Sequence, residues 1–239
     1  MKRCESNLNQ GFPIKGKPVS SRPAIAQCPT CLPSAIWLPF LTMTRSIEFF
    51  DQQFARSASA AALVLNPFET LALPYLHGEV LDFGSGMGNL AFAAARQGCR
   101  VTALDASQAA VAHMQQRAAA EALPVRAELA DLRQYRIDAD YDCIVSIGLL
   151  MFFDCSTARK VLGELQRQVR PGGYAAVNVL IEGTTYMDMF EPAEHCLFTA
   201  TDLQQRFAGW DIVQNELSEF EAPGNTVKRF ATVIARKPG

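Results

Sequence analysis

The strongest constraint on this chain is the regular alternation of short apolar runs with longer amphipathic stretches across residues 43–239. The short runs have the length of buried strands and cover residues 80–83, 100–105, 125–129, 141–146 and 174–181. Helical periodicity predicts helices over residues 47–54, 67–76, 89–97, 107–121, 156–169 and 201–207, and residues 211–220 and 226–236 have the pattern of a closing hairpin. Strands that alternate with helices predict an α/β fold, in which helices cover both faces of a parallel sheet.

Composition excludes several classes of protein. With 49% hydrophobic and 19% charged residues among 239, the chain has an ordinary globular balance and enough length to bury a core. A formal net charge of −2 predicts no nucleic-acid partner, and no apolar run is long enough to predict a membrane span. We therefore expect a small-molecule substrate and a monomer or homodimer. The odd count of seven cysteines predicts reduced thiols and a cytoplasmic location.

The average composition hides a boundary near residue 42. Residues 1–42 hold six of the 13 prolines and a net charge of +4, which leaves −6 for the rest. Closely spaced prolines interrupt helices and strands, so this segment is predicted to be a flexible arm outside the folded domain at 43–239. One interpretation is an upstream extension of a protein that begins at Met43. Cys28 and Cys31 are either unpaired thiols or half of a zinc site. We expect no metal, because only Cys4 is nearby and the first histidine is His77.

A glycine-rich turn follows the first predicted strand. Residues 82–88 read Asp-Phe-Gly-Ser-Gly-Met-Gly, and glycines in such a turn allow a ligand to approach the backbone closely. The usual dinucleotide spacing requires glycine at position 89, where this chain has Asn89. Asp82 also precedes the first glycine, and a carboxylate there suits an ammonium or sulfonium ligand better than a diphosphate.

Two further acids end the next two predicted strands. Asp105 lies where a carboxylate in an open α/β sheet can accept hydrogen bonds from both ribose hydroxyls, and we expect it to support little packing. Asp131 could accept from an adenine amino group, with Leu132 supplying apolar contact. Each acid taken alone could instead be a helix N-cap or a solvated loop residue. Three acids at successive strand ends favour one ligand site.

At these residues the chain resembles the class I S-adenosylmethionine-dependent methyltransferases. The family's acid-and-glycine loop falls on residues 82–88, its ribose-binding acid on Asp105, its adenine-flanking acid on Asp131, its strand-four motif on residues 141–146 and its Arg-Pro-Gly-Gly turn on residues 170–173. The resemblance implies S-adenosyl-L-methionine as cofactor and a three-layer αβα, Rossmann-like sheet of seven mostly parallel strands with a reversed last strand. It also implies a cofactor site formed by Asp82, Phe83, Gly84, Ser85, Gly86, Met87, Gly88, Asp105, Ala106, Ala130, Asp131, Leu132 and Ser146.

Several blocks nearer the C-terminus are most similar to the tellurite-resistance methyltransferase family. They comprise residues 150–153, 198–199, 209–210, 224–225, 229–232 and 235–237. This resemblance implies direct in-line methyl transfer to a small-molecule nucleophile such as a chalcogen oxyanion or a thiol. Two alternatives stay open: a non-catalytic subunit that binds the cofactor or assists assembly, and a nicotinamide-dependent oxidoreductase, which Asn89 and Asp82 disfavour.

No catalytic base can be identified from the sequence. A sulfonium methyl group is already electrophilic, so alignment of the nucleophile and exclusion of water are the main requirements. The candidates for contact with the methyl acceptor are His195 and Tyr186 after the fifth predicted strand, together with Arg229 in the hairpin. A surface or structural role is the competing interpretation for each.

Overall fold

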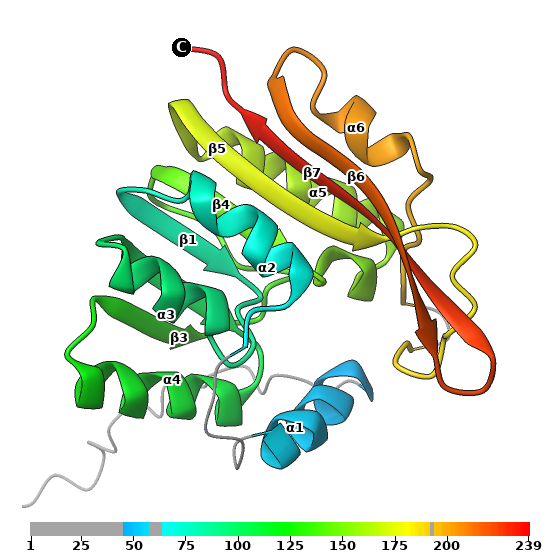
Figure 1. Ribbon diagram of the computed structural model, residues 1–239, viewed down its shortest axis with the longest axis horizontal. Helices are drawn as coiled ribbons and strands as arrows, with labels where there is room; N and C mark the ends of the chain where they lie inside the picture. The colour runs from blue at the N-terminus through cyan, green and yellow to red at the C-terminus, as the bar shows by residue number, and fades with distance from the viewer. Residues whose placement is uncertain (1–44, 58–63, 192–193) are drawn as a thin grey trace, which may run out of the picture. The chain divides into compact units, whose positions relative to one another are not determined.

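The computed structural model describes residues 45–57, 64–191 and 194–239. The predicted flexible arm, with Cys28 and Cys31, lies outside the described residues. The fold consists of one seven-stranded sheet with helices on both faces (Figure 1). The strands are β1 (Glu79–Phe83), β2 (Arg100–Asp105), β3 (Val125–Leu129), β4 (Tyr141–Ile147), β5 (Val169–Leu180), β6 (Asp211–Ala222) and β7 (Thr226–Arg236).

The strand order across the sheet is β3-β2-β1-β4-β5-β7-β6. Neighbours from β3 to β5 are parallel, whereas β7 pairs antiparallel with both β5 and β6. The last strand therefore runs against all the others. This arrangement confirms the predicted three-layer fold with its reversed final strand. The order in which strands are added to the sheet reverses between β1 and β4, and open α/β sheets bind their ligands at the carboxyl ends of the strands at such a point.

The helices are α1 (Arg45–Ser57), α2 (Pro67–Ala72), α3 (Asn89–Arg96), α4 (Gln108–Glu121), α5 (Cys155–Arg167) and α6 (Asp202–Arg206), with 3₁₀ turns η1 (Leu73–Tyr75) and η2 (Leu150–Phe152). Local sequence explains two of the starts. Ser107 caps α4 by accepting from the Ala110 amide, and Asn66 forms a reciprocal capping box with Glu69 at α2.

The core has two main layers because both faces of the central strands are buried. Successive residues of a strand point to opposite faces. In β1, Leu81 and Phe83 join the apolar cluster beneath α5 and α6, while Val80 joins the cluster beneath α2, α3 and α4. Asp82 lies on the same face as Val80, so it faces the α2 and α3 side of the sheet. Strands buried on both faces are typical of parallel sheets.

The fifth strand differs from its prediction. The sequence pattern predicts a helix over residues 156–169 and a strand only from 174, whereas α5 ends at Arg167 and β5 already begins at Val169. Val169 pairs with Tyr141, and a register shift follows before Tyr174 pairs with Cys143. Pro171 is tolerated at such an irregularity because no regular ladder bond is required of it. Tertiary pairing therefore overrides the local turn signal.

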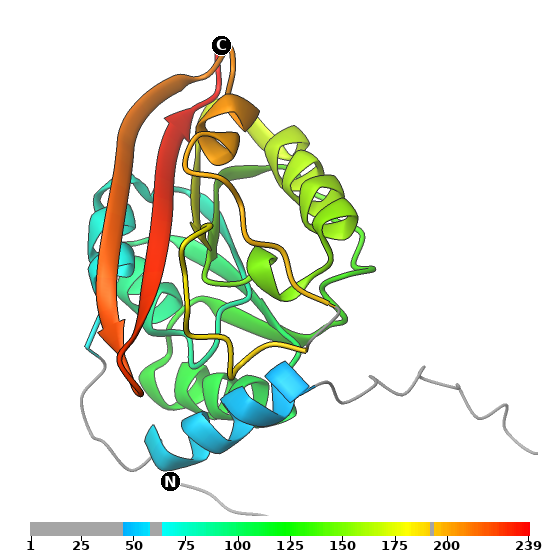
Figure 2. The same ribbon diagram turned by 90° about the vertical axis from the view of Figure 1, so that its right-hand side faces the viewer.

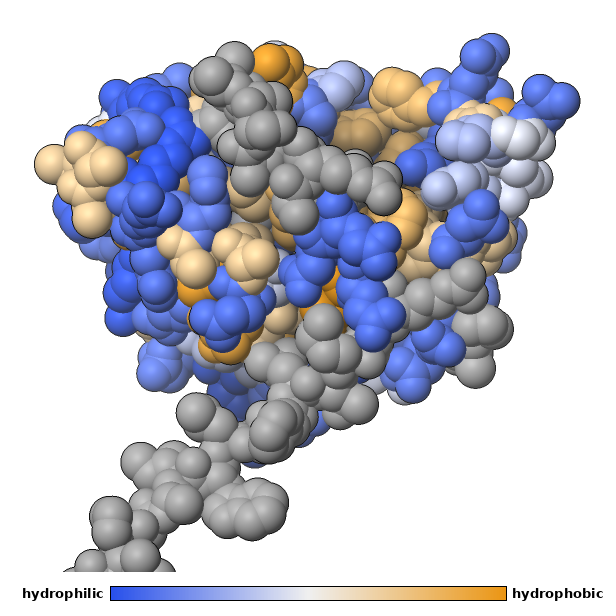
Figure 3. Space-filling model, turned by 90° about the horizontal axis from the view of Figure 1, so that it is seen from below, coloured by the Kyte–Doolittle hydropathy of each residue, from blue (hydrophilic) through white to orange (hydrophobic). Residues whose placement is uncertain are grey.

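Helix α1 lies across the end of the molecule where α4 begins, as the two ribbon views show (Figure 2). The Ser107 hydroxyl at the start of α4 donates a hydrogen bond to Asp51 of α1. Seen from this end, apolar side chains lie between polar ones and do not form one continuous patch (Figure 3). No helix in the described part of the chain has both the length and the apolar character that crossing a membrane requires.

Candidate functional site

A cavity of about 1110 Å³ opens at the carboxyl ends of the central strands. This exceeds the roughly 300–1,000 Å³ of typical ligand pockets, so it has room for more than one small ligand. Nine of the predicted site residues line it: Asp82, Gly84, Ser85, Gly86, Met87, Asp105, Ala106, Asp131 and Leu132. Phe83, Gly88, Ala130 and Ser146 lie outside this lining, and Phe83, Ala130 and Ser146 are buried.

The glycine turn between β1 and α3 needs its glycines for two reasons. Gly84, Gly86 and Gly88 all have positive φ angles, of 87°, 52° and 76°. A Cβ atom at Gly84 would also lie 2.8 Å from the Leu149 side chain, and one at Gly86 would lie 3.3 Å from the Phe54 ring. The turn is thus enclosed between the end of β4 and helix α1, which leaves its backbone on the cavity wall.

Asp105 connects the end of β2 to this turn. One of its carboxylate oxygens accepts from the Gly86 amide at 2.7 Å and the other from the Ser107 amide at 2.8 Å. Burial raises the pKa of Asp105, and the amides of Ser107 and Gly86 oppose that rise. The expectation that Asp105 supports little packing is wrong, because both oxygens hold backbone that forms the site. Each oxygen retains a second lone pair for a ligand.

Asp82 has a strongly raised pKa within the cavity. It is buried, and burial, followed by repulsion from Glu69 and Asp105, raises its pKa to about 8. The Ala91 amide opposes this effect only weakly, as the smallest of the contributions. Burial likewise raises the pKa of Glu69, which lines the same cavity from α2. A cluster of buried carboxyl groups in a cavity would be stabilised by a cationic ligand.

Asp131 lies in the turn that follows β3. Its carboxylate accepts from the Arg133 amide at 3.1 Å and from the Gln134 side chain at 3.2 Å. Leu132 beside it is buried in the core cluster on the α5 side. The three predicted acids therefore converge on one cavity, as their positions at successive strand ends predicted. In the described residues no three His, Cys, Asp or Glu side chains form a group that could hold a metal ion.

The candidates for acceptor contact separate in space. Tyr186 lines the cavity, and the Lys228 ammonium lies over its ring, 4.6 Å from the centroid. His195 stacks on Phe190 with ring centroids 5.1 Å apart, and its side chain is not part of the lining. Arg229 pairs with Glu219 at 3.2 Å on the outer side of the hairpin. Of the three, the structure brings only Tyr186 to the cavity.

Aromatic rings form a wall of the cavity that begins beside the glycine turn. Phe50 of α1 contacts Phe152 of η2 edge-on at 5.3 Å, and it stacks with Phe54 at 5.8 Å. Phe50 and Phe54 thus line the cavity, and Phe50 also contacts a ring of the core. The aromatic lining consists of Phe49, Phe50, Phe54, Phe68, Phe152, Phe153, Tyr186 and Phe230.

Several polar residues of the lining, Glu69 and Asn178 among them, are not predicted as site residues from the sequence. Glu69 matches the pattern of a helix-capping residue, and that pattern does not predict its place in the cavity lining. Asn178 interrupts the otherwise apolar run of β5, and a lone amide in a buried strand is the signal that could have identified it.

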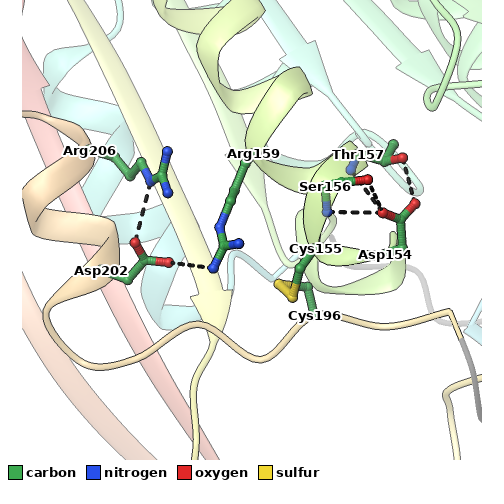
Figure 4. Close-up of a disulfide and its surroundings, with 8 residues drawn as sticks. All are labelled: Asp154, Cys155, Ser156, Thr157, Arg159, Cys196, Asp202 and Arg206. Carbon is green, nitrogen blue, oxygen red and sulfur yellow. Dashed lines mark hydrogen bonds and ion pairs between the residues drawn. A yellow bond between two sulfur atoms is a disulfide. The ribbon is translucent and has the colours of Figure 1, made fainter.

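A disulfide joins the two segments that flank the aromatic wall. Cys155 begins α5 and Cys196 lies in the segment after β5, with Cα atoms 4.7 Å apart (Figure 4). The Cys196 amide also donates to the carbonyl oxygen of Met151, a lining residue, at 3.0 Å. The prediction of reduced thiols is therefore wrong for this pair, because the fold places two cysteines 41 residues apart within bonding distance. Cys143 is a free, buried core residue.

Comparison with known proteins gives a consistent result. Residues 80–173 match the family described as "Methyltransferase domain". Over 171 residues the chain is 31% identical to Hemagglutinin 1 of Eikenella corrodens, which covers 67% of this chain and 55% of that protein. It is 26% identical to the probable S-adenosyl-L-methionine-dependent methyltransferase TehB of Haemophilus influenzae (strain 10810), covering 66% of this chain and 57% of that protein.

The fold comparison agrees with the sequence matches. The crystal structure of TehB from Haemophilus influenzae superposes with a TM-score of 0.65 at 21% identity, over 79% of this chain and 67% of the other. At that level of identity the likeness shows a shared fold. The chain spans just over half the length of the curated relatives described above.

Proposed function

We propose that this chain, which belongs to the class I S-adenosylmethionine-dependent methyltransferases, transfers a methyl group from S-adenosyl-L-methionine to a small-molecule nucleophile. The observation that carries the proposal is the convergence of the glycine turn, Asp82, Asp105 and Asp131 on one cavity. The volume of that cavity, about 1110 Å³, supports a cofactor and an acceptor side by side.

The residues present fit this cofactor. Asp105 would accept from the ribose hydroxyls, Asp131 and Leu132 would flank the adenine, and Asp82 would face the cationic amino-acid end. Two observations support the fit: a buried carboxyl group with a pKa of about 8 would gain from a cation, and a Cβ atom at Gly86 would narrow the cavity toward Phe54. We extend the proposed contacts to Gly84, Ser85, Met87 and Ala106, which line the cavity, and not to Phe83, Gly88, Ala130 and Ser146, which lie outside its lining.

Little acid–base chemistry is required of the protein. When bound, the cofactor supplies an electrophilic methyl carbon, to which the acceptor's lone pair bonds as the carbon–sulfur bond breaks and its electron pair returns to sulfur. The chain's own contribution is to orient the acceptor and to exclude water. The aromatic wall formed by α1 and η2 would supply the exclusion, because these apolar rings line the cavity and contact one another.

For the acceptor we propose a chalcogen oxyanion or a thiol. Lys228 supports a negatively charged acceptor. It lines the cavity, and burial lowers the pKa of its ammonium group because the charge loses hydration. An anion beside the ammonium would compensate for that loss. Among the described residues no carboxylate pairs with it. An anionic oxygen or a thiolate could therefore use this charge. Neither class of nucleophile needs a general base when it arrives deprotonated.

The test combines binding with turnover. Calorimetry should show that S-adenosylmethionine binds and that NAD(H) does not, since Asn89 replaces the glycine that a dinucleotide site needs. Incubation with selenite, tellurite and a set of thiols should then release S-adenosylhomocysteine, measured by mass spectrometry. Binding without release over a broad acceptor panel would favour the non-catalytic alternative. Binding of NAD(H) alone would favour the oxidoreductase.

A further inference from the structure

Asn178 is a buried amide at the point where β5 passes the end of β4. In the register of the sheet it pairs with Ile147, and the Gly148 amide donates to its backbone carbonyl at 3.0 Å. Asn178 is one of the residues that line the cavity, and it is buried there. Asp82 pairs with Val145 on the other side of β4. Asp82 and Asn178 therefore lie on the two strands that flank the end of β4.

Only half of the Asn178 amide has a partner. Its Nδ2 donates to the Thr232 hydroxyl oxygen at 2.9 Å, and Thr232 is the directly paired residue on β7. Its Oδ1 accepts no hydrogen bond, although the atom is buried. Buried acceptors of this kind are uncommon in folded proteins, because the lost hydration is normally replaced by a hydrogen bond. Because the bond to Thr232 engages Nδ2 and fixes the amide, Oδ1 remains available to a ligand in the cavity.

The surroundings of this acceptor are apolar. Leu180 lies two residues along the same face of β5, Phe230 pairs with Leu180 from β7, and both line the cavity. Such apolar walls suit the uncharged part of a ligand. The unpartnered carbonyl oxygen of Asn178 repels a deprotonated oxyanion and attracts an N–H, O–H or S–H group.

We propose that Asn178 determines which methyl acceptors this cavity takes, by accepting a hydrogen bond from them through Oδ1. The favoured acceptor is a largely apolar molecule that carries an N–H, O–H or S–H group. This inference rests on the proposed methyltransferase function and narrows it. Of the two acceptor classes proposed above, it favours a protonated thiol over a fully deprotonated oxyanion. Asn178 orients the donor group, and the displaced proton leaves to water.

The experiment measures the binding of matched probes to the protein saturated with S-adenosylhomocysteine. Phenol and anisole share a ring, but only phenol has a donor hydrogen; aniline and N,N-dimethylaniline form a second such pair, and selenite is the anionic probe. We expect the wild-type protein to bind each donor about three- to tenfold more tightly than its methylated partner, the effect of one net hydrogen bond.

Three variants complete the test. Asn178→Leu should abolish the donor preference, whereas Asn178→Asp retains an acceptor oxygen and should keep it. Asn215→Leu is the matched control, because Asn215 is exposed on β6 and outside the cavity lining, and it should behave as wild type. Thermal melts of each variant show that the fold is intact, and the Asp variant keeps the test valid if the Leu variant does not fold.

Several outcomes would overturn the proposal. Equal binding of phenol and anisole, tighter binding of selenite than of phenol, or no binding of either donor probe would each do so. Tighter binding of selenite than of phenol would indicate that the amide is rotated by 180°, with Nδ2 facing the cavity. Weakened S-adenosylhomocysteine affinity in Asn178→Leu, with the donor preference kept, would assign Asn178 to the cofactor. If wild-type protein fails to bind S-adenosylhomocysteine yet distinguishes phenol from anisole, the proposed function fails while the Asn178 site stands.

Discussion

At the scale of single residues, the acids of this site have structural and ligand-facing roles at once. Asp105 was chosen from the sequence for its place at a strand end, but its two oxygens also hold the amides of Gly86 and Ser107. Removal of such a side chain therefore changes the empty site as well as its affinity. A melt of the free protein and a titration are both needed to separate the two effects.

Replacement of Asp105 by alanine should weaken cofactor binding by about 30- to 150-fold, or about 2–3 kcal/mol for two partly exposed charge-assisted hydrogen bonds. The free protein should also lose about 1–2 kcal/mol of unfolding free energy, because two backbone amides lose their partner. Calorimetry and urea denaturation measure the two quantities. Asp138→Ala, at an exposed loop position, is the control and should change neither. Unchanged affinity in Asp105→Ala would remove the proposed ribose contact.

Replacement of Gly86 by valine should abolish measurable cofactor binding while the protein remains folded. The new side chain would begin 3.3 Å from the Phe54 ring and extend into the cavity. Gly209→Val is a suitable control, because Gly209 also has positive φ and a Cβ atom there meets nothing within 4 Å. Both variants carry backbone strain, so only the Gly86 variant should lose affinity in a calorimetric titration. Binding within about threefold of wild type would place the cofactor elsewhere.

At the scale of elements, the cavity depends on segments that are distant in sequence. Helix α1 brings Phe50 and Phe54 to the glycine turn and is held to α4 by the bond between Asp51 and Ser107. On the opposite side, the disulfide links the start of α5 to the segment that carries Tyr186 and Met189. Asp154 caps α5 beside it by accepting from the Ser156 and Thr157 amides (Figure 4).

Reduction of the disulfide should destabilise the fold. A cross-link between residues 41 apart contributes roughly 2–4 kcal/mol by restricting the unfolded chain. Urea denaturation with and without dithiothreitol should show a loss of about this size in wild-type protein. The Cys155→Ser, Cys196→Ser double variant should match the reduced protein and should not respond to dithiothreitol. Equal stability of the oxidised and reduced wild type would show that the bond does not form in solution.

At the scale of the whole molecule, the buried acids link stability to pH. Asp82, Glu69 and Asp105 all have raised pKa values, with burial as the largest cause for each. A raised carboxyl pKa means that the folded state holds the proton more tightly than the unfolded chain. The stabilising contribution is therefore complete below about pH 4 and is lost as pH rises through the folded pKa, which for Asp82 is about 8.

The free protein should therefore become less stable between about pH 5 and pH 8, and Asp82→Asn should reduce this slope because asparagine does not titrate. S-adenosylhomocysteine should bind more tightly as pH rises over the same interval, since its ammonium group favours the ionised carboxylate. Denaturation midpoints across the range and calorimetry in buffers of different ionisation enthalpy would measure both effects. The exposed Asp138→Asn variant should keep the wild-type slope. A wild-type slope in Asp82→Asn would assign the pH dependence to other groups.

Local sequence determined the order and kind of the elements and the position of the glycine turn. Strand periodicity at residues 100–105 and 125–129 matches β2 and β3, because side-chain alternation and burial are encoded within a few residues. The resemblance to a known family supplied the reversed last strand and the identity of the cofactor. The three acids could be placed at one edge of the sheet because parallel strands end together.

Only the tertiary structure decided the features that depend on contact between distant segments. The early start of β5 comes from the pairing of Val169 with Tyr141, against the local signal of Pro171. The disulfide requires Cys155 and Cys196 to meet across two separate segments, and no spacing rule predicts that meeting. The free oxygen of Asn178 exists because Thr232, 54 residues away, occupies the other half of the amide. Hydrogen-bond satisfaction and cavity shape are properties of the packed molecule, so periodicity in the chain cannot contain them.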